Sequence, residues 1–99
     1  MAESAALLAL QAATHAAVVA GPGSCPAALR EAIAAGRPPA DLAHLVATIR
    51  AHAYRLTEAD VDSLRAAYTE DQLFEIIVAA AVGAAEHRLR AALGALEQA

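Results

Sequence analysis

The sequence has no lysine, no tryptophan and a single cysteine, and each scarcity excludes a class of function. Seven arginines are its only strongly basic residues, they form no cluster, and eleven acidic residues leave a net charge of −4 at pH 7. Because gathered basic side chains hold a nucleic-acid backbone, we expect no nucleic-acid partner. The lone Cys25 cannot form an intramolecular disulfide, a Cys-x-x-Cys redox pair or a thiolate metal cluster.

Long hydrophobic runs are also absent. The apolar stretch from Leu73 to Ala85 is shorter than the roughly 20 residues that a bilayer requires, and it contains Glu75. Residues 1–4 lack the basic segment of a secretory signal, and polar residues interrupt the apolar stretch 5–20. We therefore expect no membrane partner and predict a mature cytoplasmic protein.

Alanine dominates what is present, at 31 of 99 residues in a chain that is 59% apolar. This composition favours helices that pack closely through small side chains, and few large residues are left to build a thick core. A domain of this size has little stability to spare, so burial of helix faces between subunits would stabilise it. We therefore predict a homo-oligomer.

Glycine and proline divide the chain into about five predicted helices. Together these helices are predicted to form one all-α domain, residues 1–99. The predicted helices cover about 4–20, 26–36, a segment opening at Pro39, 57–67 and some 28 residues from Glu70. No segment has the pattern of a strand. The apolar residues expected to face inward on the third and fourth helices are Leu42, Leu45, Val46, Ile49, Val61 and Leu64.

The last predicted helix has the clearest start. Thr69 can accept a hydrogen bond from the backbone of Gln72 while the Gln72 side chain reaches back, and Thr57 begins the preceding helix in a similar way. At 1.5 Å per residue the last helix would be roughly 42 Å long, against a radius of gyration of about 13 Å for a compact domain. We expect its apolar centre, Ile77 to Ala85, to be buried and its tail to contact another subunit.

The segment from about Leu42 to Leu96 resembles the C-terminal half of the alkylhydroperoxidase-like, or carboxymuconolactone decarboxylase, superfamily. The resemblance rests on residues 56–61 opening a short helix, 64–67 closing it, 68–75 starting the next, and His87-Arg88-Leu89 late in that helix. It implies an alkylhydroperoxidase-like helical bundle with a long, largely buried C-terminal helix.

The chain departs from that superfamily in two places. Active members use a Cys-x-x-Cys pair with a following histidine and a preceding glutamate, whereas Cys25 has no second thiol to resolve an oxidised one. Thiol peroxidase activity is therefore not expected. The glycine common before the last helix is also missing, since 66–68 runs directly into Thr69.

Several residues are candidates for chemistry. Cys25 lies just ahead of a predicted helix start, which could lower its pKa, but an inert loop cysteine is the simpler interpretation. Glu75 could act as a general acid or base or simply lie on a solvent face. Glu86 and Arg90 stand one turn apart and could form an ion pair. The four histidines, His15, His44, His52 and His87, show no spacing that would make a metal site, and no cofactor is expected.

A small-molecule cavity, if the protein has one, is expected to be lined by five polar residues at a subunit interface. These are His52, Tyr54, Glu75, His87 and Arg88. The leading hypothesis is a non-catalytic helical protein that acts by homo-oligomeric assembly or small-ligand binding. One alternative is a decarboxylase-like enzyme that uses acid-base residues such as His87, Arg88 and Glu75 without cysteine. Another is a helical adaptor for a different protein.

Overall fold

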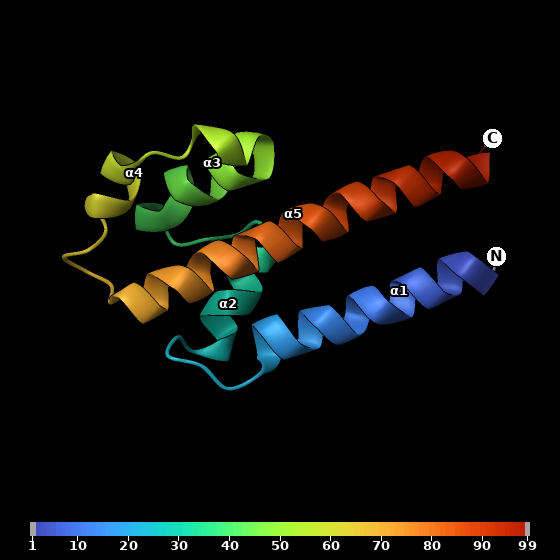
Figure 1. Ribbon diagram of the computed structural model, residues 1–99, viewed down its shortest axis with the longest axis horizontal. Helices are drawn as coiled ribbons and strands as arrows, with labels where there is room; N and C mark the ends of the chain where they lie inside the picture. Colours follow the sequence, from blue (N-terminus) through green and yellow to red (C-terminus); the bar gives the residue numbers. More distant parts are fainter. Residues whose placement is uncertain (1, 99) are drawn as a thin grey trace.

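A computed structural model describes residues 2–98, and within that range the chain forms helices and connecting turns with no strand (Figure 1). The α-helices are α1 (Ala2–His15), α2 (Ala27–Ala34), α3 (Ala43–His52), α4 (Glu58–Asp62) and α5 (Glu70–Gln98). A π-helical turn, Ala16–Ala20, extends α1, and short 3-10 turns cover Ala40–Leu42 and Ala53–Arg55. The all-α prediction with about five helices is confirmed. None of the helices in this range is both long and apolar enough to cross a membrane.

The first predicted helix ends where Gly21-Pro22-Gly23 was expected to end it. A buried arginine, Arg30, fixes this end because its guanidinium donates to the backbone oxygens of Val18, at 3.0 Å, and of Gly21. Carbonyl groups at the end of a helix have no partner within the helix, so these hydrogen bonds satisfy them and tie α1 to α2.

The second helix closes with a glycine, as predicted from Gly36. Gly36 has a positive φ of 79°, a conformation that suits glycine because it has no Cβ. Its backbone N–H donates to the backbone oxygen of Ile33 at 3.1 Å, and the backbone N–H of Arg37 donates to the backbone oxygen of Ala32 at 2.8 Å. This pair of hydrogen bonds is the Schellman motif, which turns the chain sharply and sends Arg37 out of the helix end.

The core lies between α2, α3 and the first half of α5. The predicted inward residues of the third helix, Leu42, Leu45, Val46 and Ile49, are all buried there. Cys25, Ile33, Ile76, Ala79 and Ala80 complete the core, and Val61 and Leu64 pack against it half-buried. Small side chains on α5 allow its neighbours to approach closely, as the alanine content predicted.

The fourth helix is shorter than expected. Thr57 and Asp60 form the capping box that starts it, but α4 ends at Asp62 and not at Ala67. Beyond Asp62 the backbone N–H groups of Leu64, Arg65 and Ala67 donate to the third residue back, which makes tight turns in place of an α-helix. The boundary prediction was wrong because sequence periodicity alone does not separate such turns from a helix end.

The fifth helix begins as predicted and has 29 residues. The N–H of Thr69 donates to the Gln72 side chain at 2.9 Å, and the N–H of Gln72 donates to the Thr69 hydroxyl at 3.1 Å. Its buried residues all lie between Leu73 and Glu86. In the stretch expected to be buried all round, Ala81 and Ala85 are exposed because α2 and α3 cover one side of the helix.

The second half of α5 leaves the core and runs beside α1, which points the opposite way (Figure 1). Both chain ends consequently lie at the same end of an elongated molecule measuring 47 × 28 × 18 Å. The α1 helix and the second half of α5 thus form a two-helix arm.

Candidate functional site

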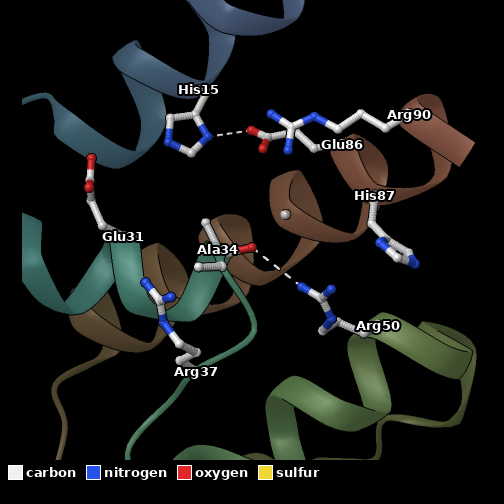
Figure 2. A pocket seen from close by; sticks show the side chains of 10 residues that line it. His15, Glu31, Ala34, Arg37, Arg50, Glu86, His87 and Arg90 are labelled. Atoms are coloured by element: carbon white, nitrogen blue, oxygen red, sulfur yellow. Dashed lines mark hydrogen bonds and ion pairs between the residues drawn. The ribbon is translucent and has the colours of Figure 1, made fainter. Parts of the chain in front are cut away.

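A polar cavity of about 350 Å³ lies where α1, α2, α3 and α5 meet, at the base of the arm (Figure 2). Its backbone floor includes Ala34 on α2 and Gly83 on α5. These two helices touch so closely that a Cβ added at Gly83 would lie 2.1 Å from the Ala34 carbonyl oxygen. The titratable side chains that line the cavity are His15, Glu31, Arg37, Arg50, Glu86, His87 and Arg90.

A partly buried hydrogen bond between α1 and α5 closes the side of the cavity next to the arm. The Glu86 carboxylate on α5 accepts from His15 Nδ1 on α1, and the Glu86 side chain is nearly inaccessible to water (Figure 2). This contact joins residues 71 positions apart in the chain. The structure gives Glu86 a hydrogen bond with His15 in place of the expected ion pair with Arg90, because α1 brings the imidazole to the buried side of α5.

A hydrogen-bonded arginine forms the opposite side. Arg50 on α3 donates to the backbone oxygen of Ala34 at 3.3 Å, and its guanidinium lies over Gly36, where an added Cβ would come within 3.1 Å of it. A positive charge there complements the negative end of α2. Arg88 donates to the backbone oxygen of Arg50 at 2.7 Å, which joins α3 to α5 outside the cavity.

Two further arginines reach the cavity with no hydrogen-bond or ion-pair partner among the described residues. The arginine hydrogen bonds and ion pairs found within residues 2–98 do not include Arg37 or Arg90. Arg37 comes from the turn after α2, and Arg90 from α5 (Figure 2). Each guanidinium offers five N–H donors in a planar fork that suits a carboxylate or a phosphate.

The cavity favours a negatively charged guest. Three guanidinium groups face two carboxylates, a net charge of +1 before His15 or His87 is protonated, and one carboxylate is already engaged by His15. Arginine cannot ligate a metal ion, because it has no acceptor. Across the described part of the chain no three histidine, cysteine or acidic side chains gather as metal ligands. The lining is therefore suited to binding an anion.

The structure places one of the five expected ligand-binding residues, His87, in this cavity. Arg88 follows His87 in the chain but does not line the cavity; its guanidinium donates to the backbone oxygen of Arg50. His52 and Tyr54 stack edge to face at the end of α3, with ring centroids 5.7 Å apart, and both are exposed. Glu75 lies elsewhere on α5, so the five do not share one site within a single chain.

Glu75 and Cys25 hold the loop before α2. The Glu75 carboxylate accepts from the backbone N–H of Ser24 at 2.8 Å and of Cys25 at 3.1 Å. The Cys25 thiol is 3% exposed and donates to the Gln72 backbone oxygen at 3.5 Å. Burial, followed by the Glu75 charge, raises the pKa of this thiol. Burial of the thiol and its raised pKa favour the inert interpretation over a thiol activated by the helix start.

Sequence reasoning missed most of the cavity. Arg37 could have been found, because Gly36 predicts a helix end and the next residue then lies beside the negative pole of that helix. His15, Arg50 and Arg90 had no comparable signal, since their meeting depends on how four helices pack.

Comparisons with protein-family models, curated proteins and solved structures find no match to this chain. The alkylhydroperoxidase-like resemblance accordingly stays a prediction, and the geometry of the cavity carries the functional argument.

Proposed function

We propose that this chain is a non-catalytic helical protein that binds a small carboxylate or phosphate anion in the polar cavity. One observation carries the proposal: arginines from three separate segments, Arg37, Arg50 and Arg90, converge on a single cavity. Two of them have no other partner within the described residues. Glu31 and Glu86 offset only part of the positive charge of the three guanidinium groups, so their convergence favours the binding of an anion.

The size of the cavity fits the proposed guest. A volume of about 350 Å³ lies at the lower end of the range for small-molecule sites, which is roughly 300–1,000 Å³. His15 and His87 could add hydrogen bonds to the anion. We place this activity in the cytoplasm, where a free cysteine such as Cys25 stays reduced.

The geometry favours binding over the decarboxylase-like alternative. That alternative relied on Glu75 as an acid-base partner of His87 and Arg88. The Glu75 carboxylate is instead occupied by two backbone N–H groups of the loop before α2. Within one chain, the three residues do not face a common substrate.

Isothermal titration calorimetry with inorganic phosphate and with succinate would test the proposal at low ionic strength. Arg37→Ala and Arg90→Ala should each weaken binding of the preferred anion by about tenfold or more, since each removes a charge-assisted contact. Arg65→Ala is the matched control, because Arg65 is half-exposed and pairs with Asp62 and Glu70 away from the cavity. It should leave affinity unchanged.

Two results would overturn the proposal. One is the absence of saturable binding of either anion by the unmodified chain. The other is an equal loss of affinity in all three variants, which would show attraction to overall charge and not to the cavity. Far-ultraviolet circular dichroism of each variant checks that its helix content is unchanged.

A further inference from the structure

The molecule exposes more surface than a compact chain of its mass. Its accessible surface is 6184 Å² at 10.1 kDa. A typical monomer of that mass exposes roughly 5,300 Å², so the excess is about 900 Å². The radius of gyration, 14.6 Å, also exceeds the roughly 12.6 Å of a compact domain of this length. The arm formed by α1 and the second half of α5 accounts for the elongated shape (Figure 1).

An apolar groove of about 350 Å³ runs along this arm between its two helices. Its lining is mainly apolar and comprises Leu7, Leu10, Gln11, Thr14, Val82, Ala85, Glu86 and Leu89. Large leucines beside and within the groove face water: Leu10 is 67% exposed, and Leu96, further along α5, is 64% exposed. Exposed leucines gathered at an apolar groove are typical of an interaction surface.

The α1 wall of the groove carries no charge. Residues 5–14 contain alanine, leucine, glutamine and threonine only. The chain as a whole has a net charge of −4, so two copies repel each other over most of their surface. The uncharged face of α1 is a place where two copies can meet without bringing like charges together.

We infer that a second copy of this chain covers the groove. The excess surface of about 900 Å² matches the roughly 800 Å² that each partner buries in a standard protein interface. A two-fold arrangement uses the same patch on both copies, so each arm supplies a groove and also the apolar helix that fills its partner's groove.

The experiment is size-exclusion chromatography with light scattering over a range of protein concentrations, in buffer without multivalent anions. The unmodified chain should have a mass of about 20 kDa, twice the 10.1 kDa of one copy. Leu10→Glu should raise the dissociation constant at least a hundredfold and give a mass near 10 kDa. Because Leu10 is largely exposed within one copy, its replacement leaves the core intact.

Phe74→Glu is the matched control. Phe74 has the same exposure as Leu10, 67%, but lies in the first turns of α5 outside the groove, so this variant should stay paired. A larger closed oligomer that Leu10→Glu dissociates would equally support the groove as the self-interface. A mass of one copy for the unmodified chain at every concentration would overturn the inference, as would pairing lost in Phe74→Glu and kept in Leu10→Glu. Neither result depends on anion binding.

Discussion

Two glycines in α5 should respond in opposite ways to replacement by alanine. A Cβ at Gly83 would lie 2.1 Å from the backbone oxygen of Ala34 and 2.7 Å from its carbonyl carbon. A Cβ at Gly94 would meet nothing within 4 Å. Both residues sit within the same helix, so the difference between the two variants isolates the contact between α5 and α2.

The expected magnitudes follow from two opposing effects. Alanine favours the helix over glycine by about 0.8–1.0 kcal/mol, so Gly94→Ala should stabilise the chain by nearly that amount. Gly83→Ala gains the same term but forces apart two backbones that cannot yield as a side chain can. Overpacking costs typically 1–3 kcal/mol, and a backbone clash belongs at the upper end, which leaves a net loss of about 1–2 kcal/mol. For a domain of this size the midpoint of thermal unfolding should fall by roughly 4–16 °C.

Urea unfolding followed by circular dichroism would measure both variants. All samples need the same protein concentration, because self-association adds stability that depends on it. A Gly83→Ala protein as stable as the unmodified chain would refute the close approach of α2 and α5. The same result would also contradict the described floor of the polar cavity, since Ala34 and Gly83 both contribute to it.

Two further predictions follow from perturbed pKa values. Iodoacetamide should modify Cys25 slowly at neutral pH, because burial and the Glu75 charge raise the pKa of its thiol. The rate of modification should rise with pH around a midpoint above the pKa of a free thiol, and a midpoint below that value would contradict the prediction. The hydrogen bond from Tyr68 to Asp41 raises the pKa of Tyr68 to about 12 from 10.0. In a Tyr54→Phe protein, which keeps Tyr68 as its one tyrosine, phenolate absorbance should therefore appear with a midpoint near pH 12. The contribution of this hydrogen bond to the free energy of unfolding should be complete below pH 10.0 and should be lost as the pH rises toward 12. Asp41→Asn should lower the midpoint of the Tyr68 titration. An unchanged midpoint would show that the hydrogen bond to Asp41 is not the cause of the raised pKa.

Features that depend on neighbouring residues were predictable from the sequence. Thr69 and Gln72 predicted the start of α5, and Gly36 predicted the end of α2, because caps act over three or four residues. The spacing of apolar residues such as Leu45 and Ile49 predicted the buried face of α3, since helical periodicity places them on one side. These local rules were sufficient to give the all-α class.

Features that depend on helix packing were not predictable in the same way. His15 and Glu86 lie 71 positions apart in the chain, and nothing in the sequence around either residue predicts their contact. Glu75 illustrates the opposite error: its place in an apolar stretch suggested chemistry, whereas its carboxylate caps backbone N–H groups. An acidic residue in such a stretch needs a partner, but the sequence does not say whether that partner is a substrate or a loop.

The polar cavity and the apolar groove share one residue, Glu86, and two helices, α1 and α5. Glu86 lines both, and α1 carries His15 into the cavity and Leu7 and Leu10 into the groove. The α1 helix touches α5 at few places, and the His15–Glu86 hydrogen bond is the contact that joins the two spaces. If a second copy covers the groove, it holds α1 against α5 and so holds His15 at the cavity. Binding free energies are reciprocal, so an anion that favours this position of His15 would strengthen the pairing of two copies by the same factor as pairing strengthens anion binding.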